Sequence, residues 1–250
     1  MSTTEVSSSA TSFTVEGEVV TLPVEVRSAT QVSATWLCDH AAAQRLTEPT
    51  GLRAARLLGG RAMVSLAAVR YLDNDLGPYH ELAVAIAVEP HDRPGSRPSM
   101  RNPATYIHRL PVNQAFTCAA GRGIWGFPKW VCTLDVVERR RSLTMTVVDE
   151  GRIVLALTVS TGGLPVPDGE TVMTAYSFAD GVLRSTPWTN RTSAMRLGPG
   201  GASLSLGGGH PMAEELRSLR LGRPLMHTAT SQMAATFGAA EVVSASSGVR

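Results

Sequence analysis

Residues 121–130 read Gly-Arg-Gly-Ile-Trp-Gly-Phe-Pro-Lys-Trp, and Lys129 in this stretch is the only lysine of the sequence. Arginine, which the chain uses elsewhere, keeps its guanidinium protonated and cannot supply a nucleophilic amine. Trp125, Phe127 and Trp130 offer apolar surface that would disfavour an ammonium group and lower the pKa of the amine. A neutral amine can attack a carbonyl carbon and form a Schiff base. The stretch therefore predicts a nucleophilic lysine, and the alternative is a surface lysine beside an aromatic turn.

The composition is typical of one globular domain. A chain of 250 residues can bury one sizeable core. We predict a single domain over residues 13–250, preceded by a disordered tail at residues 1–12, which are rich in Ser and Thr. A formal net charge of +2 with scattered arginines argues against a nucleic-acid surface. We interpret the run 139–141, which is Arg-Arg-Arg, as a solvated turn between strands.

The cysteines and the amino-terminal residues indicate the cellular compartment in which we expect the protein. Cys38, Cys118 and Cys132 are widely spaced, which fits neither a disulfide framework nor the paired spacing of a zinc site. The sequence has no segment that resembles a signal peptide and no apolar run long enough to cross a bilayer. We therefore expect reduced cysteines, a cytoplasmic location and no membrane partner.

Strand patterns dominate the chain. Residues 13–37 alternate between apolar and polar side chains and are rich in β-branched valines, which predicts two or three strands. Further strands are predicted at residues 61–72, 80–89, 105–112, 131–137, 143–148, 152–159, 171–178, 182–188, 193–197 and 225–243. With only two or three brief helices, this pattern predicts a mainly β (α+β) fold, an antiparallel barrel or sandwich.

Capping residues locate the helices, which we predict at residues 40–46, 113–119 and 211–219. Asp39 stands as the N-cap of the first helix, and Asn113 can cap the second. The glycines of residues 121–126 then allow the chain to leave the second helix by a tight path. Lys129 is accordingly predicted on an exit turn and not within a regular element.

These residues together resemble the acetoacetate decarboxylase family. The likeness rests on residues 106–112, which read Tyr-Ile-His-Arg-Leu-Pro-Val, on the Gly121-Arg122 pair, and on the turn that ends in Pro128-Lys129. Residues 224–243 are similar to the final strands of the family. The resemblance implies an antiparallel cone-shaped β-barrel with a Schiff-base lysine inside it. It also implies that the protein needs no metal or organic cofactor and forms homo-oligomers.

The resemblance also nominates residues that would act beside Lys129. Glu81 matches the acidic residue that follows a tyrosine turn, which makes Tyr79 and Glu81 part of the predicted site, with Glu81 catalytic. The alternative for Glu81 is an ordinary charged residue at the start of a strand. Arg122 keeps the arginine of the Gly-Arg pair, although an arginine there can also bind the carbonyls at a helix end. Phe127, beside the lysine turn, completes this set as a substrate-binding residue.

The chain departs from the family pattern at several charged positions. Trp130 replaces the second lysine, so a neighbouring cation cannot lower the pKa of Lys129 and desolvation alone must do so. Glu81 opposes this lowering if it lies close to the amine and is ionised, so we predict that desolvation prevails only if apolar side chains seal Lys129 from water. We still place Trp130 among the substrate-binding residues. Ala115 and Gly123 occupy the positions of two family acids. The arginine that binds the substrate carboxylate falls near Ala29, with Arg27 as a stand-in, and these changes disfavour acetoacetate itself.

Three functions remain open at this point. In the first, Lys129 forms an imine with a β-keto acid, and the protonated imine accepts the electrons released as carbon dioxide leaves. In the second, the same imine serves an aldol, retro-aldol or dehydration step on a keto acid, with Glu81 moving protons. In the third, the barrel binds a small ligand without catalysis, because one fold can host many functions.

Overall fold

The computed structural model describes residues 11–95 and 103–245. Most of the predicted tail, residues 1–10, lies outside the described residues. Ser12, also assigned to the tail, begins the first strand and pairs with Thr21. That residues 13–250 form a single domain remains a prediction from the sequence.

Strands account for about 60% of the described residues. In chain order they are β1 (Ser12–Val15), β2 (Glu18–Thr21), β3 (Val24–Cys38), β4 (Ala62–Asn74), β5 (Tyr79–Ala87), β6 (Ala104–Val112), β7 (Lys129–Val131), β8 (Thr133–Arg139), β9 (Ser142–Asp149), β10 (Arg152–Ser160), β11 (Leu164–Pro165), β12 (Gly169–Ala179), β13 (Val182–Ser193), β14 (Arg196–Pro199), β15 (Ala202–Leu206), β16 (Pro224–Phe237) and β17 (Glu241–Ala245). The helices are α1 (His40–Thr47), α2 (Ala115–Trp125) and α3 (Pro211–Ser218), with short 3-10 turns at Glu48–Thr50 and Leu58–Gly60.

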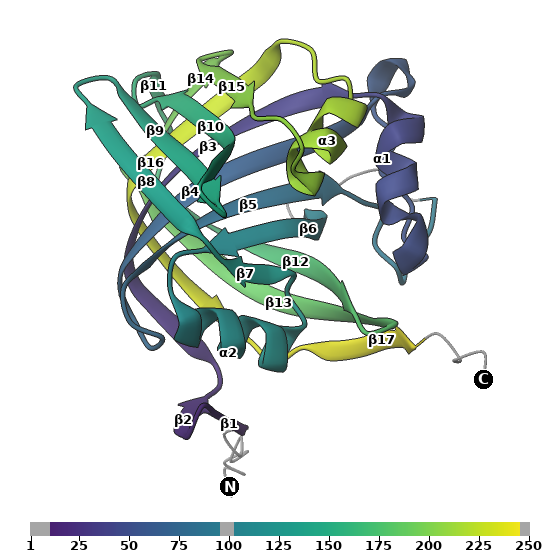
Figure 1. Cartoon of the computed structure of the whole chain (residues 1–250), viewed down its shortest axis with the longest axis vertical. Helices are drawn as coiled ribbons and strands as arrows, with labels where there is room; N and C mark the ends of the chain where they lie inside the picture. The colour runs from purple at the N-terminus through teal and green to yellow at the C-terminus, as the bar shows by residue number, and fades with distance from the viewer. Residues whose placement is uncertain (1–10, 96–102, 246–250) are drawn as a thin grey trace, which may run out of the picture.

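Seven strands close into a barrel, which confirms the predicted fold class (Figure 1). The ring runs β16-β3-β4-β5-β6-β12-β13 and closes because β13 also pairs with β16. Most neighbours are antiparallel, as predicted, but β12 runs parallel to β6. The last residues of β6 pair in parallel with the short strand β7 instead. This switch of partner along β6 places the start of β7 in the barrel wall.

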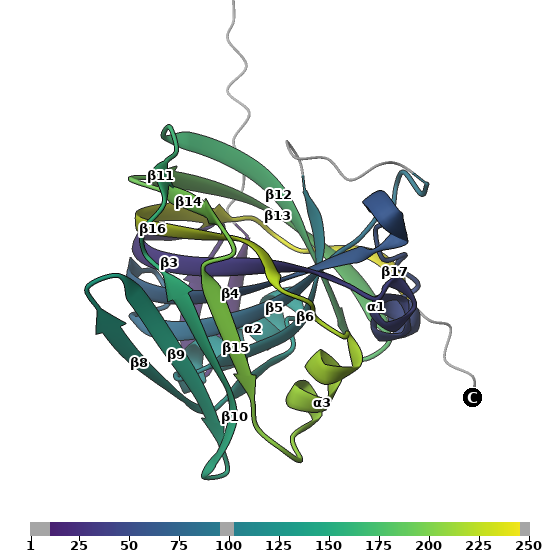
Figure 2. The same cartoon turned by 90° about the horizontal axis from the view of Figure 1, so that it is seen from above.

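A second sheet covers part of the outside of the barrel. Its strand order is β15-β10-β9-β8, and Figure 2 shows it beside the barrel strands with α3 next to it. The predicted meander is confirmed, and its second turn uses Glu150 and Gly151 with φ of 47° and 73°. The arginine run at 139–141 is exposed: Arg139 ends β8, and Arg140 and Arg141 form the turn to β9, as expected.

The two faces of strand β5 carry side chains of different size. On β5, Leu82, Val84 and Ile86 are buried in the main core, which joins the outer face of the barrel to the second sheet, α1 and α3. The alternating residues Ala83 and Ala85 face the interior. Because side chains alternate between the faces of a strand, large residues fill the outer core while small ones leave the interior open.

The helices agree with the sequence except at α2. Asp39 caps α1 as predicted, since its carboxylate accepts from the backbone N–H of Ala42 at 2.8 Å. The prediction for α2 is wrong at both ends. Gln114 is the N-cap, while Asn113 accepts from the N–H of His80, and the helix continues to Trp125. Lys129 consequently begins strand β7.

No helix in residues 11–95 and 103–245 is both long enough and apolar enough to span a membrane. Cys38 and Cys118 are buried, Cys132 is partly buried, and none of the three forms a disulfide.

Candidate active site

The barrel encloses a cavity of about 220 Å³. Its wall is formed by the inward-facing side chains of the barrel strands, together with side chains from β7 and from the end of α2. Most of this wall is apolar, which is typical of a small-molecule site. Lys129 and Glu81 are the charged side chains among the described residues that line it.

Lys129 and Glu81 form a buried ion pair inside this cavity. The Nζ of Lys129 lies 2.8 Å from the Oε2 of Glu81, and each residue is only 6% exposed. β5 carries Glu81 and β7 carries Lys129, and both strands pair with the end of β6, where Val112 is opposite Glu81 and Leu110 is opposite Lys129. The strand pairing therefore brings together two residues that are far apart in the sequence.

Two tyrosines and a threonine complete the polar group. The hydroxyl of Tyr71 donates to Oε1 of Glu81 at 3.1 Å, so the two carboxylate oxygens have different partners. Lys129 donates to Oγ1 of Thr117 at 3.4 Å, and its Nζ lies 5.0 Å from the centre of the Tyr79 ring. The two tyrosine rings stack at 4.3 Å. The ammonium group is thus surrounded by a carboxylate, a hydroxyl and an aromatic face.

The electrostatics of the pair overturn one expectation. Burial by itself lowers the pKa of Lys129, but the nearby Glu81 and Tyr79 oppose it, and the net pKa is raised. The predicted lowering of the amine pKa is therefore wrong, because an opposite charge in contact favours the ammonium form. Burial also raises the pKa of Tyr71 and of Tyr79, so both remain phenols at neutral pH.

Helix α2 holds the stem of the lysine side chain. Gly121 lies inside this helix, and a Cβ added there would be 2.5 Å from Cδ and 2.7 Å from Cε of Lys129. A real Cβ does not approach other atoms so closely. Gly121 therefore serves the packing of the lysine, a different role from the exit turn that the sequence suggested. Gly126 does end the helix, with a φ of 65°.

The structure brings some of the predicted substrate-binding residues together with the ion pair. Tyr79 and Phe127 line the cavity, as does Trp125. Trp130 does not, because it follows Lys129 on a strand and faces the opposite side. There it is partly buried against the main core and stacks on His210 with ring centres 6.1 Å apart.

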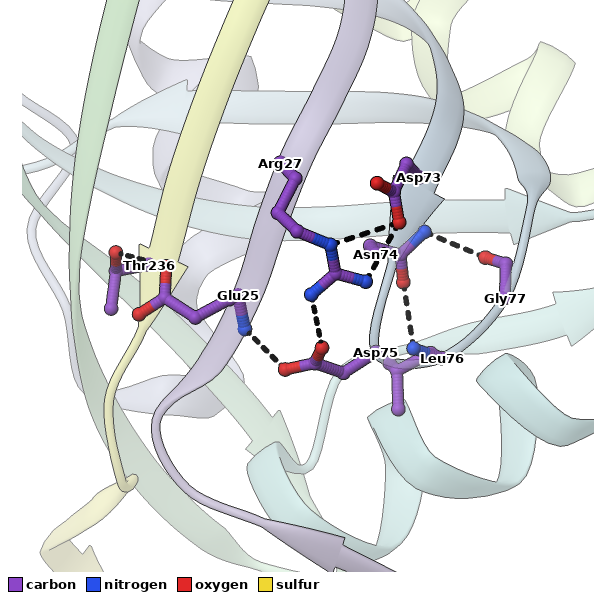
Figure 3. Close-up of polar contacts among 8 residues, drawn as sticks. All are labelled: Glu25, Arg27, Asp73, Asn74, Asp75, Leu76, Gly77 and Thr236. Carbon is purple, nitrogen blue, oxygen red and sulfur yellow. Dashed lines mark hydrogen bonds and ion pairs between the residues drawn. The ribbon is translucent and has the colours of Figure 1, made fainter.

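The two predicted arginines lie away from the cavity wall. Arg122 is exposed in the last turn of α2, which is the helix-end position that the sequence allows as its alternative role. Arg27 has a half-exposed side chain that binds Asp73 and Asp75 at the end of the β3–β4 pair (Figure 3). The structure therefore does not bring Arg122 or Arg27, both predicted to bind the substrate, together with the ion pair.

Sequence reasoning missed Tyr71, Thr117 and the structural role of Gly121. Tyr71 could have been found from strand periodicity, because it continues the inward series of β4 with Ala67 and Val69. Thr117 carried no such signal, since helix α2 was predicted with the wrong ends. In the described part of the chain, no group of three or more His, Cys, Asp or Glu side chains is placed to hold a metal ion.

Comparisons with known proteins identify the family of the chain and the proteins that share its fold. The family model described as acetoacetate decarboxylase (ADC) matches residues 10–247. A comparison with curated protein sequences finds no significant match. The next comparison is therefore with the folds of solved structures.

Several solved structures share the fold at low sequence identity. The acetoacetate decarboxylase from Legionella pneumophila subsp. pneumophila str. Philadelphia 1 is 16% identical, with a TM-score of 0.68, and the match covers 90% of this chain and 89% of that one. The enduracididine biosynthesis enzyme MppR complexed with pyruvate is 15% identical, with a TM-score of 0.66 and coverage of 90% and 91%. Another MppR structure contains the condensation product of pyruvate and imidazole 4-carboxaldehyde, at 15% identity, a TM-score of 0.65 and coverage of 89% of each chain.

Proposed function

The chain belongs to the acetoacetate decarboxylase family, and from this premise we propose that it is an enzyme whose Lys129 forms a Schiff base with the carbonyl carbon of a small substrate. The observation that carries the proposal is the ion pair of Lys129 and Glu81, buried in an apolar cavity at 2.8 Å. Lys129 is the only lysine of the sequence. A buried amine beside a proton acceptor is the arrangement that imine formation requires.

The first chemical steps use only the ion pair and the substrate. Glu81 accepts a proton from the ammonium group, and the free Nζ attacks the carbonyl carbon. The new C–N bond forms while the carbonyl electrons move to the oxygen, and the oxygen takes up a proton that the attacking nitrogen loses, which gives a neutral carbinolamine. Glu81 then returns its proton to that hydroxyl, the C–O bond breaks, and water leaves. The product is a protonated imine beside the Glu81 carboxylate, so the charge of the pair is conserved.

The protonated imine can then accept electrons in two ways. From a β-keto acid, the C–C bond to the carboxylate breaks, carbon dioxide leaves, and the electron pair moves toward the imine nitrogen to form an enamine. Alternatively, Glu81 removes a proton from the carbon next to the imine, and the enamine attacks an aldehyde. After loss of carbon dioxide, the enamine takes up a proton at carbon and becomes a protonated imine again. After the addition, the former aldehyde oxygen takes up the proton that Glu81 had removed. In both cases water finally hydrolyses the imine and restores the amine. One protein with this fold, from Legionella pneumophila, is named as an acetoacetate decarboxylase, which corresponds to the first outcome. Another, MppR, is complexed with a condensation product of pyruvate, which corresponds to the second.

A β-keto or α-keto acid is the substrate class that the family resemblance predicts. The chemistry of imine formation is the same for a ketone or an aldehyde without a carboxylate. The third possibility, a barrel that binds a ligand without catalysis, differs in that it forms no covalent adduct. Adduct formation therefore separates both enzymatic functions from the binding module.

Trapping the imine tests this proposal. Incubation with a panel of small ketones and keto acids in the presence of cyanoborohydride should add the mass of the reduced substrate irreversibly, and peptide mapping should place it on Lys129. Lys129→Arg is the control, because it keeps a cation beside Glu81 but removes the nucleophile. The proposal fails if no carbonyl compound labels Lys129, or if Lys129→Arg is labelled as efficiently as the parent protein. Release of carbon dioxide then distinguishes decarboxylation from condensation.

Two further expectations belong with this proposal. The family resemblance favours a homo-oligomer, and the composition favours a cytoplasmic protein that binds neither nucleic acid nor membrane. Light scattering of the purified chain would measure the number of subunits.

A further inference from the structure

The charged side chains of the cavity wall determine whether the substrate can carry a charged group. Among the described lining residues, Lys129 and Glu81 are the charged ones, and they neutralise each other at 2.8 Å. The remaining polar groups of the wall are neutral amides, hydroxyls and phenols. The two arginines that the sequence nominated lie outside it, and Arg27 already binds two aspartates.

Imine formation leaves this balance unchanged. An ammonium group and a neutral carbonyl compound become one protonated imine and one water, so the positive charge beside Glu81 stays single throughout. A substrate carboxylate would add a second anion to the same apolar cavity. No described residue of the wall would pair with it, and an unpaired buried charge is strongly unfavourable.

Neutral amides are available for recognition in the same wall. The Oδ1 of Asn190 is buried and has no hydrogen-bond partner. Two serine hydroxyls of the wall are already satisfied, since Ser33 pairs with Thr228 at 2.7 Å and Ser65 with Thr35 at 2.9 Å. A buried oxygen without a partner is costly. Asn190 is therefore the group that gains most from a ligand, and its Oδ1 accepts a hydrogen bond from a donor such as a hydroxyl.

We propose that the substrate is an uncharged ketone or aldehyde that carries a hydroxyl or another neutral hydrogen-bond donor, and that the Oδ1 of Asn190 accepts from that donor. This inference rests on the proposed Schiff base and narrows its substrate class. It replaces the keto acid expected from the resemblance, because the cavity has no cation free to bind a carboxylate in the part of the chain that the structure describes. Without a carboxylate to lose, the imine can lose a proton from the neighbouring carbon to give the enamine, which adds to an aldehyde. In the reverse direction, the imine of a β-hydroxy ketone loses its hydroxyl proton to Glu81, the C–C bond breaks, and an aldehyde leaves with the enamine remaining on Lys129.

The test compares matched pairs of probes. In the first pair, hydroxyacetone carries a hydroxymethyl group where pyruvate carries a carboxylate. In the second pair, 4-hydroxy-2-butanone and acetoacetate differ in the same way. Each probe is trapped on the parent protein with cyanoborohydride, and the rate of Lys129 labelling is measured. This rate is divided by the rate at which the same probe labels Nα-acetyl-lysine in solution, which corrects for the intrinsic reactivity of the probe's carbonyl group. We expect the hydroxyketone of each pair to label Lys129 at least about tenfold faster, the ratio that about 1.4 kcal/mol of discrimination produces. Equal or faster labelling by the keto acids overturns the inference but leaves the Schiff base intact, whereas labelling by no probe overturns the proposed function.

Asn190→Leu tests the hydrogen bond separately. The parent protein should label faster with 4-hydroxy-2-butanone than with 2-butanone, and Asn190→Leu should remove this preference while 2-butanone still reacts. Thr189→Val is the matched control, because Thr189 precedes Asn190 on β13 and its side chain faces the other side of the strand. If the preference survives in Asn190→Leu, or if it is lost equally in Thr189→Val, Asn190 has no part in recognition.

Discussion

The Nζ of Lys129 and the Oε2 of Glu81 lie 2.8 Å apart in a cavity where each residue is 6% exposed. Burial by itself lowers the pKa of the amine, but the contact with Glu81 outweighs it and the net pKa is raised. The amine is therefore stored as an ammonium ion and becomes a nucleophile only when it passes its proton to Glu81. This coupling is the physical difference between this site and one in which a second lysine lowers the pKa by repulsion.

Replacing Glu81 should reverse the direction of the pKa shift of Lys129. In Glu81→Gln the opposite charge is gone while the burial remains, so the amine should titrate at lower pH than in the parent protein. The measurement is the pH dependence of Lys129 modification by an amine-selective reagent, read by peptide mass. Tyr71→Phe is the control, because it keeps the carboxylate and removes only the hydroxyl that donates to it. An equal or higher midpoint in Glu81→Gln would show that Glu81 does not raise the pKa of Lys129.

Two glycines of α2 provide a matched pair of substitutions. Gly121→Ala places a Cβ against the middle of the Lys129 stem, which the ion pair prevents from moving away. We expect a loss of about 1–3 kcal/mol in the free energy of unfolding and slower trapping of the imine. Gly123→Ala meets no atom within 4 Å, so it should be neutral or stabilise by up to about 1 kcal/mol, because alanine favours the helix. Urea unfolding of both variants measures the difference, and equal effects would contradict the packing role of Gly121.

Trp130 should affect stability but not the titration of the lysine. Its ring packs on His210 and the main core, outside the cavity. Trp130→Ala should lower the free energy of unfolding by about 2 kcal/mol, less than for a fully buried tryptophan. Modification of Lys129 should keep the pH midpoint of the parent protein. A shift as large as that of Glu81→Gln would mean that Trp130 shields the amine after all.

The contact between β6 and α3 should make the fold sensitive to acid. Partial burial alone would raise the pKa of Glu215, but hydrogen bonds with His108 and Arg109 lower it to about 2. The His108 Nε2 lies 3.0 Å, and the Arg109 Nε 2.8 Å, from Oε2 of Glu215. Because the folded pKa lies below the ordinary value of 4.5, the stabilisation is complete above that value and is lost as the pH falls through about 2.

Glu215→Gln should therefore remove part of this pH dependence. We expect it to cost about 2 kcal/mol at neutral pH, as for a hydrogen bond to a charged group, and to lose less stability than the parent protein between pH 5 and pH 2, the range set by the two pKa values. Thermal unfolding at a series of pH values measures this. Glu214→Gln is the control, since Glu214 is exposed and, among the described residues, its carboxylate contacts Arg217 and a backbone N–H. Parallel pH curves for the parent protein and Glu215→Gln would contradict the assignment.

Much of the fold follows from local sequence. The two-residue period of β5, in which alanines alternate with Leu82, Val84 and Ile86, predicts a strand with unequal faces. Asp39 predicts the start of α1, and Glu150-Gly151 predicts a tight turn. The sole lysine could be nominated because arginine cannot replace a reactive amine. Each of these inferences depends on neighbouring residues or on the identity of a side chain.

The tertiary structure decided what these residues meet. Strand alternation places Lys129 and Trp130 on opposite faces, but only the pairing of β7 with β6 determines which one enters the barrel. Glu81 reaches the amine from a distant part of the chain, and Arg27 is taken by Asp73 and Asp75. The sequence by itself thus determined a β-barrel with one candidate amine. The sign of the pKa shift of that amine and the charge of its cavity depended on contacts between distant segments, because electrostatic interactions follow distance in space and not separation along the chain.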